Sequence, residues 1–434
     1  MKILLLGSGG REHAFAKNLA KSTKISQLYI APGNAGTADC GIQVSLKATD
    51  FEAMYTFCLE KEIDLIVPGP EDPLVGGIVD FFADKAAQGG RAILVAGPSQ
   101  YAAQLEGSKD FSKAFMLRHG VPTAVAFTVT KDNLNEGYAF LDTLEAPYVL
   151  KADGLAAGKG VIITPSLEEA KHTLAEMIVR ESFGKASEKV LIEEFLHGIE
   201  ISVFAVSDGI DWKFLASAKD YKRIGEGDTG LNTGGMGAIS PVPFADEVFM
   251  AKVANQIATP TFEGLKQEGH PFKGFLFIGL MNCKGEPKVI EYNVRMGDPE
   301  TESIFTRLQT DMVDLVIAIA AGGIGNLPIA LDPRTAATIF LVSGGYPGDI
   351  EKGKTMQIPA AIGDCVFYHA GTAKTESGIV TNGGRVLAVT AMGHSIAEAR
   401  DLAMQNAATI QFEGCYFRRD IGNDLMEYEQ NHHD

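Results

Sequence analysis

The chain has 434 residues and a net charge of −17 at pH 7, with 38 Lys and Arg against 55 Asp and Glu. This charge argues against a general nucleic-acid partner, because nucleic-acid binding needs a basic face. Hydrophobic residues make up 46% of the chain, enough for a large core divided over roughly two to four domains.

The cysteines and the apolar runs bear on location. The five cysteines are scattered without any C-x-x-C spacing, which favours a reducing compartment over a zinc site or a disulfide framework. No apolar run is long enough for a signal peptide or a membrane span. We therefore expect a cytoplasmic protein with no membrane partner.

The first hundred residues are typical of a doubly wound parallel sheet. Residues 2–6 form a predicted strand that runs through a glycine turn into a helix, and further strands are expected near 28–30, 63–67 and 92–95. Such a turn favours anion binding, because free N–H groups point outward at a helix start. The dinucleotide pattern G-x-G-x-x-G fails, however, since Glu12 occupies the third glycine position. A nicotinamide-dependent oxidoreductase is thus disfavoured, whereas the phosphate of a smaller ligand still fits.

The next stretch combines a lysine-bearing helix with a glycine-rich hairpin. Residues 105–119 predict an amphipathic helix capped by Ser108, and Lys109 on its own is best explained as a solvated surface lysine. Residues 148–151 and 161–163 predict two strands whose connecting loop could fold over a polyphosphate. The loop is no P-loop, because its spacing is too short and a strand follows it. A flexible surface hairpin is the alternative.

Acidic and glycine-rich segments follow. The predicted strand 190–195 carries Glu193 and Glu194, with Glu200 just beyond, and these acids could accept hydrogen bonds from an adenine amine and ribose hydroxyls. Read alone, they could equally be an exposed strand end. A charged segment at 218–223 then leads into residues 228–237, whose glycine density allows close approach of backbone to a ligand.

The most informative stretch is 288–303. A strand at 288–290 would present Glu291, Asn293 and Arg295 on one side, because strand side chains alternate between faces. Two oxygen ligands beside a guanidinium suit Mg²⁺ carrying a polyphosphate. An exposed polar strand face explains these three residues equally well when they are taken alone.

The remaining elements complete the chain. A helical stretch is expected around 246–268, and residues 274–281 and 287–292 predict a hairpin. From about residue 331 the sequence pattern changes. It predicts a strand at 336–342, an Asn-Gly hairpin turn at 381–385 and a helix that begins with a capping box at Ser395. We expect a separate α+β domain that closes the cleft.

Taken together, these motifs resemble the glycinamide ribonucleotide synthetase family of ATP-grasp enzymes. The resemblance runs from Gly-Ser-Gly-Gly-Arg-Glu-His at 7–13 to Arg-Arg-Asp-Ile-Gly at 418–422, and is most specific at Arg-Met-Gly-Asp-Pro-Glu-Thr-Glu-Ser, 295–303. It implies a multidomain α/β and α+β fold. The implied parts are an N-terminal Rossmann-like domain (1–103), an ATP-grasp core (104–122 and 191–330), a mobile lid subdomain (123–190) and a small C-terminal α+β domain (331–434).

The resemblance also implies an activity. It is the ATP-dependent ligation of glycine to 5-phosphoribosylamine through glycyl phosphate, a step of purine biosynthesis, with Mg²⁺ or Mn²⁺ and by a monomer. Another ATP-grasp carboxylate–amine ligase is the nearest alternative, and a nucleotide-sensing module that does not turn over is a further one. The sequence departs from the family at Tyr221, where His is common.

The resemblance assigns the nucleotide and the metal to particular residues. Glu291 and Asn293 would bind the metal, which water and phosphate would otherwise hold, since the strand at 274–281 carries no acid. Glu193 and Glu194 would lie at the adenine and Glu200 at the ribose. The phosphates would meet Lys109, Lys151 and a lid loop with Gly154, Gly158, Lys159 and Gly160.

The resemblance assigns the other substrates less firmly. The catalytic residues would be Arg295 on the transferring phosphate, with Asp220, Lys222, Arg223 and Asp298. The glycine and acyl-phosphate pocket would also be bordered by Gly234, Gly235 and Gly237. Phosphoribosylamine would face Gly9, Gly10, Arg11 and Asn34.

Overall fold

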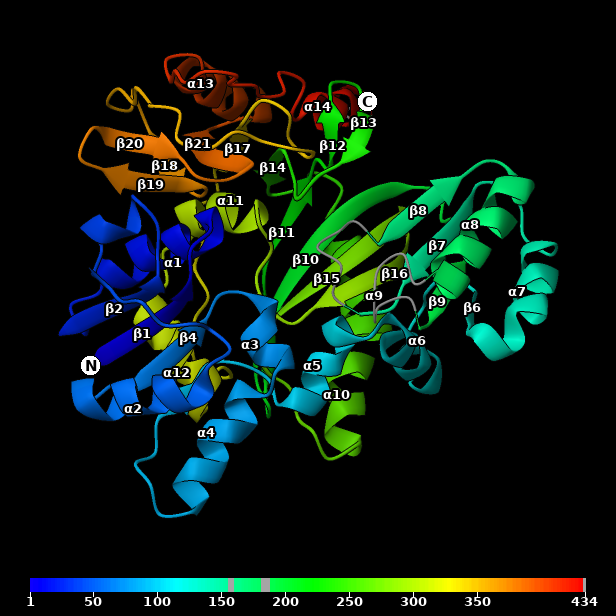
Figure 1. Ribbon diagram of the computed structural model, residues 1–434, viewed down its shortest axis with the longest axis horizontal. Helices are drawn as coiled ribbons and strands as arrows, with labels where there is room; N and C mark the ends of the chain where they lie inside the picture. Colours follow the sequence, from blue (N-terminus) through cyan, green and yellow to red (C-terminus); the bar gives the residue numbers. More distant parts are fainter. Residues whose placement is uncertain (155–159, 181–187, 432–434) are drawn as a thin grey trace.

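The computed structural model describes residues 1–154, 160–180 and 188–431. It opens with a parallel five-stranded sheet of order β3-β2-β1-β4-β5 (Figure 1). The first strand is buried throughout from Ile3 to Leu6, as expected for a parallel sheet covered on both faces. The predicted doubly wound sheet is therefore confirmed. The elements are β1 (Lys2–Gly7), α1 (Gly10–Ala20), β2 (Gln27–Pro32), β3 (Ile42–Gln43), α2 (Phe51–Lys61), β4 (Leu65–Pro68), α3 (Glu71–Val75), α4 (Ile78–Ala87) and β5 (Leu94–Val95).

Two helices lead from this sheet into the rest of the chain. They are α5 (Gln100–Gly107) and α6 (Lys109–Arg118), separated by Ser108 in an extended conformation. The Ser108 hydroxyl accepts the Phe111 N–H and so caps α6 as predicted. The prediction that one helix starts at residue 105 is wrong, because residues 105–107 end the preceding helix.

A small antiparallel sheet of order β6-β9-β7-β8 forms a separate lobe (Figure 1). Its two helices pack on it over a core of their own that includes Leu150, Leu174 and Ile192. The predicted hairpin is present, with Lys151 paired to Val161. The elements are β6 (Ala126–Val129), α7 (Leu134–Leu141), β7 (Tyr148–Ala152), β8 (Val161–Thr164), α8 (Leu167–Arg180) and β9 (Val190–Glu193).

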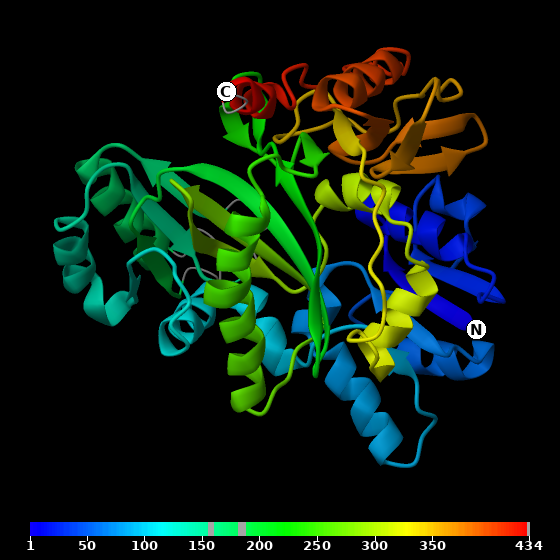
Figure 2. The same cartoon turned by 180° about the vertical axis from the view of Figure 1, so that it is seen from behind.

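The centre of the molecule is an antiparallel eight-stranded sheet of order β16-β15-β10-β11-β14-β17-β21-β18. A continuous helical rod, α9 (Glu247–Val253), a π-helical turn (Ala254–Ala258) and α10 (Thr259–Gln267), is the green helix in front of it in Figure 2. Tyr292 of β16 donates to or accepts from Thr261 of this rod at 2.6 Å. The strands are β10 (Ile199–Asp208), β11 (Trp212–Asp220), β14 (Gly237–Ser240), β15 (Lys273–Cys283), β16 (Glu286–Asn293), β17 (Thr335–Val342), β18 (Cys365–His369) and β21 (Arg385–Gly393).

This sheet contains strands from both sides of the predicted boundary at residue 331. Strand β17 pairs with β14, with Ala336 opposite Ser240 and Ile339 opposite Gly237. The C-terminal part has a further core of its own beneath α13, including Leu341, Val389 and Ala403. The other elements are β12 (Arg223–Gly225), β13 (Thr229–Asn232), α11 (Glu300–Arg307), α12 (Met312–Ala321), β19 (Thr372–Thr375), β20 (Gly378–Thr381), α13 (Ile396–Ala407) and α14 (Asn423–Asn431).

The predicted Asn-Gly hairpin turn at 381–385 is wrong. Strand β20 pairs with β19, whereas β21 pairs with β17 and β18, so residues 382–384 connect two different sheets. The backbone groups of this connection bond elsewhere: Asn382 N–H donates to Gly371, and Gly383 C=O accepts the Ser343 hydroxyl. Of the helices among the described residues, none combines the length and apolar character that a membrane crossing requires.

One buried carboxylate fixes the far end of the central sheet. Asp208, 3% exposed, accepts N–H groups from Ile210 and Asp211 in the β10–β11 turn and from Gly323 and Ile324 after α12. These bonds to a charged acceptor hold the pKa of Asp208 below its ordinary value although burial opposes the shift.

We expect Asp208→Ala to destabilise the protein by about 2 kcal/mol, since the bonded N–H groups lose a charged acceptor. The measurement is the urea midpoint at pH 7. The stabilising contribution of Asp208 is present above its ordinary pKa and is lost in acid, so the difference between wild type and variant should shrink as the pH falls toward 3. An equal midpoint for both proteins at pH 7 would contradict this account.

Candidate active site

Strand β16 ends in the three polar side chains that the sequence singles out. Tyr292 and Val294 are 2% and 1% exposed, while Glu291, Asn293 and Arg295 lie on the partly exposed side. Arg295 lies just past the strand end, and its Nη2 donates to Asn293 Oδ1 at 3.2 Å. The predicted alternation is confirmed, so a carboxylate, an amide and a guanidinium share one face.

Two carboxylates from earlier in the chain hold the Arg295 guanidinium. Glu106 of α5 lies 2.7 Å from Nη2, and Glu71 at the start of α3 lies 3.2 Å from Nε. The other oxygen of Glu106 accepts the Val294 N–H at 2.8 Å. Sequence reasoning missed both acids, since nothing local marks residues 189 and 224 positions away as partners.

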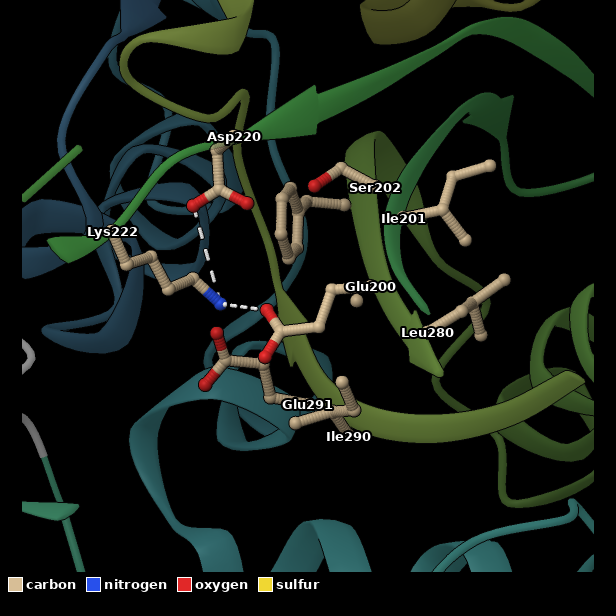
Figure 3. Close-up of a pocket in the computed structure, with 10 residues that line it drawn as sticks. Glu200, Ile201, Ser202, Asp220, Lys222, Leu280, Ile290 and Glu291 are labelled. Carbon is tan, nitrogen blue, oxygen red and sulfur yellow. Dashed lines mark hydrogen bonds and ion pairs between the residues drawn. The ribbon is translucent and has the colours of Figure 1, made fainter. Parts of the chain in front are cut away.

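A small cavity of about 10 Å³, lined by both charged and apolar side chains, lies beside Glu291 and has room for about one water molecule (Figure 3). Lys222, which lines it, is 2.9 Å from Glu200 and 4.0 Å from Asp220. Burial would lower the pKa of Lys222, but the nearby carboxylates of Asp220, Glu200 and Glu291 raise it well above its ordinary value. Lys222 therefore keeps its positive charge and is surrounded by carboxylates.

A further acid, Glu300, lies next to the residues that line the cavity. Ser202, which lines it, donates its hydroxyl to Glu300 at 3.1 Å. Burial, with help from Asp220, raises the pKa of Glu300 to about 7. Burial likewise raises the pKa of Asp220 above its ordinary value. Part of the Glu300 population therefore stays protonated near pH 7, which limits its repulsion with Asp220.

Two buried lysines share one glutamate near β16. Glu193 lies 2.9 Å from Lys113 Nζ and 2.6 Å from Lys151 Nζ, and all three residues are at most 7% exposed. Lys151 also donates to the Ile290 carbonyl next to Glu291. Two ammonium groups against one carboxylate leave one net positive charge here. Lys113 was missed by sequence reasoning, which had no reason to separate it from other helix lysines.

Lys109 connects α6 with the β7–β8 hairpin. Its Nζ donates to the Gly154 carbonyl at 2.9 Å, and its backbone N–H donates to Asp153 at 2.6 Å. Burial lowers the pKa of Lys109, while Glu291 and Asp153 oppose that shift. Lys109 is therefore not the solvated surface lysine of the simplest reading. The predicted loop residues Gly158 and Lys159 lie outside the described residues, and Gly160 pairs with Ala152.

Asp298 lies where the core meets the C-terminal part. Its carboxylate is 2.9 Å from Arg385 Nη2 of β21, and Arg385 Nη1 donates to the carbonyls of Asp298 and Gly234. The guanidinium also stacks 4.7 Å from the Phe340 ring centre. Arg385 was missed because its position in the sequence suggested only a turn.

The N-terminal glycine turn approaches the same place. The Gly9 N–H donates to Glu12 at 2.6 Å, and Arg11 pairs with Glu12 and donates to the Met296 carbonyl. Asn34 uses its amide within the protein, since it donates to the Ser8, Gly9 and His369 carbonyls. The turn is thus organised by Glu12 and Asn34.

Four predicted residues have contacts outside the cavity. Arg223 donates to the Gly230 carbonyl in the β12–β13 hairpin. Glu194 accepts the Val125 N–H and lies 3.4 Å from Lys288. A side chain at Gly237 would collide with the Thr338 carbonyl, so this glycine allows close pairing of β14 with β17. Gly235, at φ 115°, lies against Pro299 and Arg385.

The donor set fits a divalent cation that keeps most of its water. No cluster of three His, Cys, Asp or Glu side chains poised to hold a metal ion occurs in residues 1–154, 160–180 and 188–431. Glu291 and Asn293 offer one carboxylate and one amide oxygen on the same face. Magnesium typically uses one or two protein oxygens together with substrate phosphates and water.

The Glu106–Arg295 pair predicts a pH effect on stability. Burial raises the pKa of Glu106 to about 7, although Arg295 pulls it down. A raised pKa gives stability that is complete below the ordinary value of 4.5 and is lost as the pH rises through 7. Gln cannot ionise, so the thermal midpoint of wild type minus that of Glu106→Gln should decrease between pH 5.5 and 8. A constant difference would contradict the buried-acid explanation.

Comparison with known proteins agrees with this arrangement. Three family models match the chain: phosphoribosylglycinamide synthetase N domain at residues 1–106, its ATP-grasp (A) domain at 107–301 and its C domain at 336–424. A Chlorobaculum tepidum protein named phosphoribosylamine–glycine ligase is 44% identical over 97% of this chain and 99% of its own. An Escherichia coli protein of the same name is 43% identical over 99% and 100%.

Solved structures give the same result. The crystal structure of a Thermotoga maritima phosphoribosylamine–glycine ligase matches with a TM-score of 0.84 and 36% identity, over 97% of this chain and 100% of that one. A biotin carboxylase from Campylobacter jejuni, 16% identical with a TM-score of 0.74 over 99% of this chain and 96% of its own, shares the fold. The chain therefore belongs to the phosphoribosylglycinamide synthetase family, with its N-terminal, ATP-grasp and C-terminal domains.

Proposed function

We propose that this protein ligates glycine to 5-phosphoribosylamine at the expense of ATP, giving glycinamide ribonucleotide, ADP and phosphate. The observation that carries the proposal is the convergence on β16 of Glu291, Asn293 and Arg295 with the half-buried Lys109 and the buried Lys151. Joining a carboxylate to an amine is unfavourable, and phosphorylation of the carboxylate supplies both the driving force and a leaving group. The reaction thus needs charge stabilisation and positioning, which these residues offer.

The positions of the lysines indicate where the nucleotide would bind. We place the polyphosphate between Lys109 and Lys151, under the hairpin of β7 and β8. The net positive charge shared by Lys113, Glu193 and Lys151 attracts phosphate without requiring any of these side chains to be fully unpaired. Glu193 then acts mainly by orienting the two lysines, while Glu194 and Glu200 remain the candidates for the adenine and the ribose.

Arg295 is the candidate for stabilising the transferring phosphoryl group. It is held by Glu71 and Glu106, so its guanidinium is already oriented when substrates arrive. The glycine carboxylate oxygen attacks the γ-phosphorus and ADP leaves, giving glycyl phosphate. The amine nitrogen of phosphoribosylamine then attacks the carbonyl carbon, phosphate leaves and the nitrogen loses a proton.

A divalent cation, Mg²⁺ or Mn²⁺, would be held by Glu291 and Asn293 and would supply charge neutralisation at the phosphates. Asp220, Lys222 and Arg223 are proposed around the glycine, with Lys222 as the fixed cation. Asp298 and the turn at Gly9, Gly10 and Arg11 are proposed toward phosphoribosylamine. The domain boundaries at 103 and 331, a monomeric state, cytoplasmic location and the absence of a nucleic-acid partner stay predictions.

The test is ADP release with ATP, Mg²⁺, glycine and freshly made phosphoribosylamine, omitting each in turn. Full activity should need all four components. Release that ignores glycine but responds to another amino or carboxylic acid would favour a different ATP-grasp ligase. Nucleotide binding without any release would favour a sensing module.

We expect Glu291→Gln to fold normally and to lose turnover by roughly 100-fold, because several kcal/mol of transition-state stabilisation depend on the bound cation. The readout is kcat as a function of Mg²⁺ concentration, with the thermal midpoint measured in parallel. Glu286→Gln is the matched control, since Glu286 lies on the same strand, is 60% exposed and pairs with Lys252. Equal kcat for Glu291→Gln and wild type would refute the metal assignment.

A further inference from the structure

The end of β11 presents alternate side chains to two sides, as an extended segment does. Asp220 and Lys222 line the cavity beside Glu291, as Figure 3 shows. Tyr221, which lies between them in the sequence, is 3% exposed, and its hydroxyl donates to Asp424 Oδ1 of α14 at 2.6 Å. Asp424 Oδ2 lies 2.9 Å from Lys219 Nζ. One carboxylate of the C-terminal helix therefore contacts two side chains of this segment.

The Tyr221 ring also contacts two cations. Lys219 Nζ lies 4.0 Å from the ring centre, and the guanidinium carbon of Arg418 lies 5.5 Å from it. Both contacts are favourable, because the face of an aromatic ring attracts positive charge. Burial, together with Asp424, raises the pKa of Tyr221 well above its ordinary value, so the hydroxyl keeps its proton and remains a donor. Tyr221 is thus fixed at both its ring and its hydroxyl.

Arg418 fixes the chain on the other side of Lys222. Arg418 is 1% exposed, and its Nη1 donates to the Arg223 carbonyl at 3.0 Å. The same guanidinium lies 2.6 Å from Asp420, whose carboxylate is thereby its partner within the C-terminal segment. Residues 418–424 therefore contact the residue before Lys222 through its side chain and the residue after it through its backbone carbonyl.

The place of the Lys222 ammonium group depends on these contacts. The Lys222 side chain is 39% exposed and pairs with Glu200, while its carbonyl accepts the N–H and the hydroxyl of Thr233. Lysine has a flexible four-carbon stem, so the position of its charge follows the backbone that carries it. A displacement of about 1 Å at a group that orients a substrate can cost about 100-fold in rate.

We propose that Tyr221, Arg418 and Asp424 are positioning residues, which keep Lys222 and Asp220 in place at the glycine carboxylate. The assignment rests on the function proposed above and makes the C-terminal domain part of the glycine site. These three side chains contact other protein groups and act on the cavity through the backbone of the segment that they fix. Their loss should therefore impair the use of glycine more than that of ATP or phosphoribosylamine.

The first test removes one hydroxyl group. Tyr221→Phe keeps the ring and its cation contacts but loses the bond to Asp424. We expect KM for glycine to rise about 10-fold, the loss of about one hydrogen bond to a charged group, with KM for ATP and phosphoribosylamine changed less than about 2-fold. An unchanged KM for glycine, or an equal rise of all three KM values, would overturn the proposal.

The matched control is Tyr101→Phe, because the Tyr101 hydroxyl likewise donates to a carboxylate, that of Glu268, at 2.9 Å. This control should lose stability to a similar extent and keep all three KM values. A rise of KM for glycine in Tyr101→Phe equal to that in Tyr221→Phe would show that lost stability alone explains the effect, and would contradict a positioning role.

A double-mutant cycle tests whether Tyr221 acts through Lys222. Lys222→Met removes the ammonium group and keeps a long side chain. We expect Tyr221→Phe to lower kcat/KM for glycine about 10-fold in the wild-type background but less than about 2-fold in the Lys222→Met background, since coupled residues are not additive. The same fall in both backgrounds would show that Tyr221 acts independently of Lys222, and the proposal would be wrong.

Hydrogen exchange reports the same contacts without turnover. The Thr233 and Met236 N–H groups donate to the carbonyls of Lys222 and Tyr221, both at 2.7 Å. Tyr221→Phe should speed the exchange of these two amides by about 5-fold or more, whereas Tyr101→Phe should leave them unchanged. If the exchange responds but ADP release requires another acid in place of glycine, the proposed function fails and the positioning role stands. If ADP release requires glycine but the exchange does not respond, the positioning role fails alone.

Discussion

The site depends on the placement of one half-buried cation, Arg295. Its guanidinium is held by Glu71 from the start of α3, Glu106 from α5 and Asn293 from β16, so three separate segments fix one group. Removing a charge from water costs free energy, and the ion pairs with these carboxylates offset that cost. The same partners keep the guanidinium oriented, which is what stabilisation of a transferring phosphoryl group requires.

Each of the other charged groups is balanced in a similar way. Lys113 and Lys151 share Glu193, Lys222 is surrounded by carboxylates, and Arg385 pairs with Asp298. An acidic chain with a net charge of −17 thereby concentrates cations in one place and keeps them oriented. Cations that are already oriented need little reorganisation when phosphate or carboxylate groups of a ligand bind.

Sequence reasoning was reliable where the information is local. The parallel sheet, the β7–β8 hairpin and the common face of Glu291, Asn293 and Arg295 follow from residue periodicity, and the structure contains all three. Partners distant in sequence could not be predicted in this way: Glu106 lies 188 residues before Val294, and Arg385 follows Asp298 by 87. The Asn-Gly turn failed for a related reason, because backbone bonds to Gly371 and Ser343 decide which strands pair. The proposed activity came from the family resemblance, whereas the residues that hold the site side chains in place became visible only in the structure.

The central claim is that ATP transfers a phosphoryl group to the glycine carboxylate before the amide forms, and that the cations around β16 stabilise this transfer. It is tested most directly with glycine labelled with ¹⁸O in both carboxylate oxygens. Attack of that carboxylate on ATP, followed by expulsion of phosphate by the amine, leaves one labelled oxygen in each phosphate released. Mass spectrometry should therefore find one ¹⁸O per phosphate and one in the amide product. Unlabelled phosphate, with both labels retained in the product or in free glycine, would contradict the account.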